Sequence, residues 1–484
     1  MPYHWRVLSV ITLGTLLTGM NASTLNVALP VVVRHFHAGA FAANWVLLSF
    51  MLANTVLLVV FGRLSDVFGR RTTYLTGYAV FTAAGLLMGW SPGIWVLIAL
   101  RVVQAVGFAM ILANGAALIT HAFPRHLLSQ GMGVYISGIS VSQVLGPSVG
   151  GFVADAAGWR WVFWFNVPVG LAAFAWGWVT LRRVPRGPRR PIDLRGGLLL
   201  LGWLGGLLLA LSEAGALGWD SPLVRAGAVA FAVLMPVFWW AQRRTPYPLV
   251  SLELFADRGF SLANLAAFFH TLARFGIVLV FSLFFQGVWE ADAATAGLAV
   301  LPVPIAMMIA SPLAGTLARW TSPRAVAVAG PALTATGLVV LLLTLDRHTP
   351  YAVVATGLAL LGCGSGIFLT ANTTAIMTRV PHDQLGAVNG MRLTLQNVGN
   401  TLGIAMALTL IAGALPRTDR PAVFAGTVPH GELPALLSGY HRAIAVMLVM
   451  ALLSMSAAVA SLVGERHSRT VRTPAEEAPR LSDA

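Results

Sequence analysis

The chain has 484 residues, of which 57% are hydrophobic and only 10% are charged. Because soluble domains carry about 25% charged residues on their wet surfaces, this composition excludes an ordinary soluble protein. The formal net charge of +14 comes from arginine without lysine, and the arginines stand mostly between apolar stretches, so we expect a lipid bilayer and no nucleic acid as partner.

The apolar residues fall in blocks of roughly 18 to 25 residues, each long enough to cross a hydrocarbon core of about 30 Å. Backbone groups inside lipid must be hydrogen-bonded within the segment or in a closed barrel, so unbroken blocks of this length predict helices. Fourteen spans are predicted, at residues 7–29, 42–61, 73–90, 93–116, 130–153, 161–181, 196–213, 223–241, 260–286, 295–317, 325–345, 351–376, 387–413 and 441–463. The predicted fold class is an all-α polytopic membrane protein.

The distribution of arginine predicts how these helices are oriented. An even number of spans places both termini on one side of the membrane. That side would carry 21 of the 31 arginines and the opposite side 7, while Arg101, Arg274 and Arg392 fall within or at the edges of spans. Since positive charge is retained on the cytoplasmic side, both termini are predicted to be cytoplasmic.

A shift of 253 residues relates the two parts of the chain. It aligns residues 62–66 with 315–319, and Gln143, Gly146, Ser148 and Gly150 with Gln396, Gly399, Thr401 and Gly403. Duplication is a common way to build a large helical membrane protein. The predicted regions are two pseudo-symmetric six-helix bundles at 1–181 and 260–463, a basic linker with a two-helix central insert at 182–259, and a disordered cytoplasmic tail at 464–484.

The segment Gly62-Arg63-Leu64-Ser65-Asp66-Val67-Phe68-Gly69-Arg70-Arg71 leaves the second predicted span. Gly62 permits close contact between helices, and Gly69 permits a tight turn. Asp66 can pair with an arginine or face a helix N-terminus, and would then hold the two halves together when the protein is open outward. We therefore assign Gly62, Asp66, Gly69, Arg70 and Arg71 to a conformational switch. An ordinary basic loop is the alternative.

The fifth predicted span carries the pattern Gly138-x7-Gly146-Pro147-x2-Gly150-Gly151. Small residues let helices approach closely, and Pro147 removes a backbone donor and bends the helix. Because glycine and proline are common in membrane helices, a general packing face is the alternative interpretation.

These segments resemble motifs of the major facilitator superfamily, and of its fourteen-helix drug:proton antiporter branch. Residues 62–71 fit the loop motif G-x-L-x-D-x-x-G-R-[RK], residues 138–151 resemble the antiporter signature, and residues 101–107 resemble the helix 4 motif R-x-x-Q-G-x-G with Ala105 in place of glycine. The resemblance covers residues from about 7 to 463. It implies export of amphipathic compounds by alternating access, coupled to inward proton flow. We expect a monomer in a bacterial inner membrane.

The first span departs from the branch pattern D-x-T-x-x-N-V-A-L-P, because Asn21 stands where the family usually has an aspartate. That acid commonly carries the proton or faces a cationic drug, and asparagine cannot titrate. None of the 17 acidic residues is predicted to lie mid-membrane in the first, fourth or seventh span. The resemblance therefore assigns no proton-carrying role to position 21.

Basic groups occupy the predicted membrane interior instead. Arg101 lies in the fourth span and Arg274 near the middle of the ninth, with His270 one turn before it, and the 253-residue shift places Arg274 opposite Asn21. Because buried charges usually line a polar pathway, we hypothesise an electropositive cavity that prefers anionic, zwitterionic or neutral amphiphiles over cations. Arg274 could instead hydrogen-bond helix carbonyls, and for His270 simple packing is favoured over proton transfer.

Two further polar residues, Gln396 and Asn397, are candidates for the substrate path. Such residues in membrane helices more often hydrogen-bond a neighbouring helix, and that alternative is the favoured one here.

Other classes of function find little support. The sequence has no H-E-x-x-H and no P-loop, and its histidines are scattered. We predict no catalytic residue, no metal and no cofactor, and therefore no enzyme. The alternative to drug export is transport, in either direction, of a specific organic anion or metabolite with no proton coupling or a different one.

Overall fold

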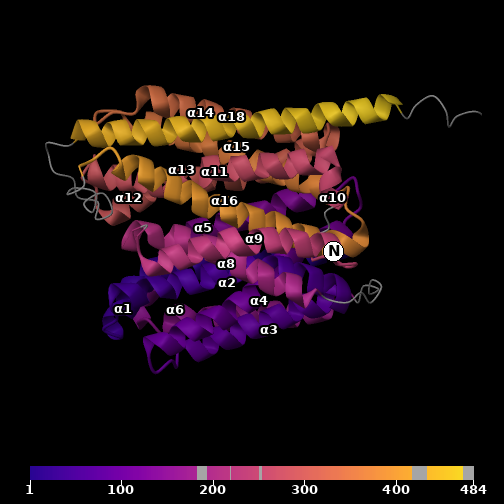
Figure 1. The fold of residues 1–484 in the computed structure, drawn as a ribbon, viewed down its shortest axis with the longest axis horizontal. Coiled ribbons are helices and arrows are strands. Elements are labelled where there is room, and N and C mark those ends of the chain that lie inside the picture. The colour runs from indigo at the N-terminus through magenta and orange to yellow at the C-terminus, as the bar shows by residue number, and fades with distance from the viewer. Residues whose placement is uncertain (183–192, 219, 250–252, 417–432, 472–484) are drawn as a thin grey trace, which may run out of the picture.

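The computed structural model describes residues 1–182, 193–218, 220–249, 253–416 and 433–471, and over these residues the chain is helical and has no strand. Figure 1 shows the long helices side by side along a common direction. They are α1 (Tyr3–His35), α2 (Ala40–Phe68), α3 (Arg70–Met88), α4 (Ile94–Ala122), α5 (Leu128–Ala157), α6 (Trp161–Trp164), α7 (Asn166–Thr180), α8 (Leu194–Leu217), α9 (Pro222–Arg244), α10 (Glu253–Ala256), α11 (Arg258–Gly287), α12 (Ala293–Ala299), α13 (Pro302–Trp320), α14 (Pro323–Thr344), α15 (Tyr351–Met377), the 3-10 helix η1 (His382–Gln384), α16 (Leu385–Ala412) and α18 (Leu433–Val471).

Within the described residues, 12 segments are helical, long and apolar enough to cross a membrane, and each coincides with a predicted span. The remaining two predicted spans, 7–29 and 73–90, coincide with α1 and α3, which are helices of 33 and 19 residues in the same bundle. α3 begins with two arginines and contains four threonines, which lower its hydropathy. The all-helical membrane architecture is confirmed, and the count of fourteen spans stays a prediction.

Two predicted spans are interrupted. The span at 161–181 consists of α6 and α7, and the span at 295–317 consists of α12 and α13. α13 starts at Pro302 because proline has no N–H for a helical hydrogen bond and fits best in a first turn. At the other boundary, α18 continues to Val471, beyond the predicted end of its span at 463, and most of the predicted tail, 472–484, lies outside the described residues.

The helices pack in two groups. Helices α1–α7 pack mainly against one another, as do α11–α16 with α18, and the two groups meet along α2 with α16 and α5 with α13. The pair α8 and α9 lies on α2 and α16, where Leu200, Leu204 and Phe238 form an apolar cluster with Val56 and Val59. In Figure 1 this pair crosses the middle of the view, between the two groups.

Both ends of the described chain lie at one end of the bundle, where α1 begins and α18 ends (Figure 1). This end is named the terminal end, and the opposite one the distal end. Because successive long helices alternate in direction, α2 and α13 finish at the terminal end, and α5 and α16 begin there. The segment 62–71 therefore lies at the terminal end.

Candidate functional site

The first candidate site lies where α2 meets α16 at the terminal end. The carboxylate of Asp66 accepts backbone N–H groups from Gly386 (3.1 Å) and Ala387 (2.9 Å), in the first turn of α16. It also accepts a side-chain hydrogen bond from Arg70 (2.9 Å), and Arg70 in turn donates to the carbonyl of His382. The first N–H groups of a helix lack partners in their own helix and attract negative charge, so Asp66 caps α16 from the other half. Asp66 and Arg70 are only 8% and 6% exposed, which strengthens these charged hydrogen bonds.

Glycines make this contact possible. A Cβ atom at Gly62 would collide with the carbonyl oxygen of Gly386, so α2 and α16 touch through their backbones. Gly69 has a φ of 99°, which a residue with a Cβ rarely adopts, and it makes the turn from α2 to α3. Arg71 lies on the opposite side: it donates to the carbonyl of Leu181 (2.6 Å) and stays within its own half.

The contact between α5 and α13 is the repeat-related counterpart. A Cβ atom at Gly133 would lie 2.5 Å from the carbonyl oxygen of Ser311, and one at Gly315 would collide with the carbonyl of Ser129. Adding 253 to Gly62 gives Gly315, and adding 253 to Gly133 gives Gly386, so glycines at the same two repeat-related positions build both contacts.

The pattern at 138–151 faces α1. A Cβ atom at Gly150 would lie 2.7 Å from the Cα of Thr24, and Thr24 donates its hydroxyl to the carbonyl of Gly146 (3.1 Å). Gly138 lies against Thr12 on the same helix. The small residues therefore serve a close α1–α5 contact, with Pro147 and Gly151 on the same stretch of α5.

Two of the predicted candidates, Arg101 of α4 and Asn21 of α1, contact each other. Its Nη1 donates to Asn21 Oδ1 (3.1 Å) and Gln104 Oε1 (2.5 Å), its Nε donates to the carbonyl of Val46 (3.3 Å), and its guanidinium lies 4.1 Å from the centre of the Phe50 ring. Over the described residues Arg101 pairs with no carboxylate. Asn21 and Arg101 are 3% and 2% exposed, so a substrate reaches them only after a rearrangement.

His270 and Arg274 lie one turn apart on α11. The ring of His270 is fully buried, its centre lies 4.3 Å from that of the Phe368 ring, and neither ring nitrogen has a hydrogen-bond partner. Arg274 is partly buried, with Nη1 3.7 Å from the sulfur of Met307. α1 and α11 are not among the helix pairs that pack closely over the described residues, so this cluster is separate from that of Asn21.

Arg392 of α16 is another buried arginine, and it was not a sequence candidate. Its Nη2 donates to Asn389 (2.9 Å) and its Nη1 to Thr373 (3.1 Å) and Gln396 (3.4 Å), and it is 2% exposed. Over the described residues Arg392 also pairs with no carboxylate. Its position inside a predicted span was the signal that could have found it.

The polar residues of α16 also link the two groups of helices. Asn389 donates to the carbonyls of Leu112 (3.2 Å) and Ala113 (2.8 Å) on α4, and Asn397 donates to the hydroxyl of Thr55 (3.2 Å) on α2. Asn397 thus makes an interhelical hydrogen bond. The hydrogen bonds described between the two groups of helices lie in the half of the bundle nearer the terminal end.

The comparisons with known proteins agree with these motifs and this fold. The family model described as Major Facilitator Superfamily matches residues 11–404 and 263–482. The chain belongs to the major facilitator superfamily. It is a multi-pass membrane transporter and not an enzyme.

Curated members of the superfamily cover most of this chain. It is 32% identical over 410 residues to the multidrug resistance protein Stp of Mycobacterium tuberculosis, and 28% identical over 411 residues to the tetracenomycin C resistance and export protein of Streptomyces glaucescens. Each alignment covers 84% of this chain and 76% of the relative. The riboflavin transporter RibZ of Clostridioides difficile is 25% identical over 418 residues, which cover 86% of this chain and 90% of RibZ.

Solved structures of superfamily members share the fold. The human organic anion transporter MFSD10 has a TM-score of 0.67 and 15% identity, with 95% of this chain and 100% of that chain covered. The proton:xylose symporter XylE has a TM-score of 0.64 and 15% identity, with 94% of each chain covered. At such identities the likeness concerns the fold alone.

Proposed function

We propose that this transporter exports amphipathic compounds by alternating access. The observation that carries the proposal is the pair of repeat-related contacts, α2 with α16 and α5 with α13, which hold the terminal end shut. The hydrogen bonds described between the two halves gather near that end, so a rocking motion could open the distal end while these contacts persist. The relatives named as resistance and export proteins support export as the direction.

The proposed membrane topology follows the arginine distribution. Fourteen spans, with the terminal end in the cytoplasm of a bacterial cell and the distal end outside its inner membrane, place Asp66 and Arg70 on the cytoplasmic side. Residues 1–181 and 260–463 form the two bundles, which move relative to each other. Residues 182–259 contribute the central insert, and residues 464–484 are the cytoplasmic tail. The transporter works as a monomer. In this frame, the Asp66 contact closes the cytoplasmic entrance.

The proposed substrates are anionic, zwitterionic or neutral amphiphiles. Arg101, Arg274 and Arg392 lie inside the bundle, and over the described residues neither Arg101 nor Arg392 has a carboxylate partner. A fixed positive charge in a medium of low dielectric constant attracts anions and repels lipophilic cations.

The proposed proton pathway cannot use Asn21. His270 is the candidate because its buried ring has two unpaired nitrogens and lies one turn from Arg274. Asp155, near the outer end of its span, and a substrate that carries its own proton are the other candidates. In reconstituted vesicles, His270→Phe should abolish substrate-induced proton movement and spare substrate binding if His270 carries the proton. Unchanged proton movement in this variant would exclude His270 and leave Asp155 or the substrate.

The main experiment is a toxicity panel in cells with and without the protein, over compounds of different charge, followed by transport into inverted vesicles. Export of several anionic or zwitterionic amphiphiles, weakened by Arg274→Ala, is the expected result. Export of a quaternary ammonium dye that is lost with Asn21→Ala and unaffected by Arg274→Ala would contradict the charge preference. Asp220→Asn, at an exposed position of the distal end, is the matched control.

A second candidate function is transport of one specific organic anion or metabolite without proton coupling, or with a different one. Arg101 and Arg392, which have no carboxylate partner over the described residues, favour it, as does the relative named as a riboflavin transporter. A response to a single compound across the panel, with no proton movement, would establish this alternative.

A further inference from the structure

Arg392 of α16 is surrounded by neutral oxygen atoms while the terminal end is closed. Its Nε (3.3 Å) and Nη2 (2.9 Å) both donate to one acceptor, Asn389 Oδ1, and its Nη1 donates to Thr373 and Gln396. Arg392 is 2% exposed and Asn389 is fully buried. Because a buried guanidinium binds anionic oxygens more strongly than neutral ones, these partners leave the charge of Arg392 uncompensated over the described residues.

The edge of the guanidinium formed by Nε and Nη2 is suited to a substrate anion. Two parallel N–H groups on such an edge match the two oxygens of a carboxylate, with which they form paired, charged hydrogen bonds. In the closed protein both N–H groups share the single oxygen of the Asn389 amide. A carboxylate is therefore the better acceptor for this edge of Arg392 whenever it can reach it.

Asn389 occupies this edge because the other half of the protein fixes its side chain. Its Nδ2 donates to the carbonyl oxygens of Leu112 (3.2 Å) and Ala113 (2.8 Å) on α4, while its Oδ1 faces Arg392. The amide thus lies between α4 of one half and the guanidinium of the other. It stands about one helical turn inward from the Asp66 contact. Opening of the terminal end separates α4 from α16 and so releases the Asn389 amide.

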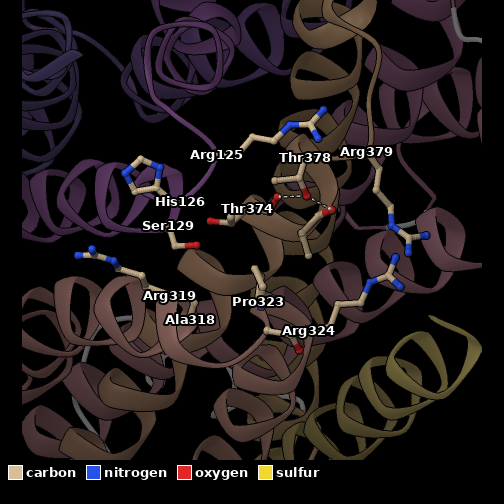
Figure 2. Close-up of a pocket in the computed structure, with 12 residues that line it drawn as sticks. Arg125, His126, Ser129, Ala318, Arg319, Pro323, Arg324, Thr374, Thr378 and Arg379 are labelled. Atoms are coloured by element: carbon tan, nitrogen blue, oxygen red, sulfur yellow. Dashed lines mark hydrogen bonds between the residues drawn. The ribbon is translucent and has the colours of Figure 1, made fainter. Parts of the chain in front are cut away.

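Other arginines of the molecule do not share this arrangement. Arg101 donates to groups on α1, α2 and α4, which all belong to the first group of helices, so separation of the halves leaves its contacts intact. A cavity of about 270 Å³ at the terminal end, shown in Figure 2, has neither Arg392 nor Asn389 in its lining. The arginines that line this cavity are Arg125, Arg319, Arg324 and Arg379.

We propose that the Nε and Nη2 edge of Arg392 binds the carboxylate, or another group with two anionic oxygens, of a substrate that enters from the terminal end. This inference rests on the proposed export. While the terminal end is open, Asn389 is free of α4 and gives way to the substrate anion. Closure returns the Asn389 amide to the α4 carbonyls and to Arg392, where it displaces the anion. Binding is therefore tight toward the terminal end and weak toward the distal end, as export requires.

The test measures the binding of two xanthene dyes to the purified full chain by fluorescence anisotropy. Fluorescein carries a carboxylate, and tetramethylrhodamine ethyl ester is a cation of similar shape. Gly62→Leu, which places a side chain against the carbonyl oxygen of Gly386, is expected to hold the terminal end open. Fluorescein should bind this variant about tenfold more tightly than the wild type, because charged hydrogen bonds are the strong ones. Added to Gly62→Leu, Arg392→Gln should remove that gain without weakening the binding of the rhodamine ester, and Arg392→Lys should restore part of it.

A second variant gives the opposite effect. Asn389→Ala removes the competing amide and should raise the affinity of the otherwise wild-type chain for fluorescein several-fold, a gain that misfolding would not produce. Thr394→Val is the matched control, since it removes another hydrogen bond between the halves, to the carbonyl of Thr55 (2.8 Å), and leaves the edge of Arg392 occupied. Arg125→Gln removes an exposed arginine of the cavity in Figure 2 and should leave the affinity for fluorescein unchanged.

Three results overturn the proposal. They are an absence of fluorescein binding, equal fluorescein affinity of Gly62→Leu with and without Arg392→Gln, and a gain in Asn389→Ala no larger than that in Thr394→Val. The proposed export fails separately: if these affinities follow the expected pattern and vesicles show no export, the anion site stands and only the direction of transport is contradicted.

Discussion

Two contacts related by the repeat hold the terminal end together, α2 against α16 and α5 against α13. In both, glycines at repeat-related positions let backbones touch, as at Gly62 and Gly315. The first contact also contains a buried carboxylate, Asp66, that reaches across to the other half, whereas the second has Arg319 at that position beside a basic cavity. The two contacts therefore share a close backbone approach, and at the equivalent position the first carries a negative charge and the second a positive one.

The largest effect is expected from removing the close backbone contact that both sites share. Gly62→Leu places a side chain against the carbonyl of Gly386, so the terminal end cannot close, and overpacking of this kind costs about 1–3 kcal/mol. We expect transport in vesicles to fall to background with the protein still in the membrane. Gly133→Leu should do the same at the second contact.

The control for this prediction is Gly205→Leu on α8. Nothing lies within 4 Å of the position where a Cβ at Gly205 would stand. Near-normal transport by Gly62→Leu, or an equal loss in Gly205→Leu, would mean that close backbone approach is not what holds this end shut.

The charge that distinguishes the first contact comes next in expected effect. Asp66→Asn removes the negative charge from the N–H groups of Gly386 and Ala387, and hydrogen bonds to charged groups contribute about 1.5–3 kcal/mol each. Spin labels across the terminal end should report a shift toward the open state by about tenfold or more. Asp220→Asn, at an exposed position, should leave the distances unchanged.

The next prediction concerns the buried hydrogen bond between Asn21 and Arg101 in the first half. Asn21→Asp places a carboxylate about 3 Å from Arg101 Nη1, where it forms a buried ion pair. Because both charges are then compensated, we expect a change in thermal stability of about 1 kcal/mol or less. In competition assays, cations should compete for transport better, relative to anions, in this variant than in the wild type.

The matched variant is Asn264→Asp, at another buried asparagine, whose described hydrogen bond goes to the carbonyl of Phe260. With no guanidinium in that contact, the new charge should destabilise the protein more than Asn21→Asp does. Equal stability of the two variants would argue against the role of Arg101 as the partner.

The smallest effect concerns a carboxylate that caps a helix within one half. Asp292 accepts the N–H of Thr295 (2.6 Å) at the start of α12, and this hydrogen bond lowers the pKa of Asp292 below the ordinary 3.8. The contribution to stability is therefore present above pH 3.8 and is lost as the pH falls through the lower folded-state pKa. Asp292→Ala should reduce the unfolding temperature slightly at neutral pH and leave transport unchanged.

Asp292→Asn keeps a capping oxygen and serves as the control, since asparagine caps helices well. It should retain the unfolding temperature and lose the acid dependence. If Asp292→Ala lost as much transport as Asp66→Asn, the importance of Asp66 could not be attributed to its hydrogen bonds between the two halves.

The membrane class, the positions of the helices and the location of the α2–α3 motif could all be predicted from the amino-acid sequence. Long apolar blocks require helices in lipid, and Gly69 has a local reason to be glycine, because its φ is positive at the turn from α2 to α3. The interruption of the tenth predicted span before Pro302 could also have been read from the chain, because proline punctuates helices locally.

Which polar side chains contact one another could not be predicted from the sequence and follows from the packing of the helices. Asn21 and Arg101 share one hydrogen bond, Arg392 forms its own network, and a cavity at the terminal end is lined by arginines from α13, α14, the loop before α5 and the turn after α15. The reason is that a membrane helix is apolar on most of its circumference, so hydropathy locates the helix along the chain but not its rotation about its axis. That rotation, set by packing against helices far away in sequence, determines which side chains face one another.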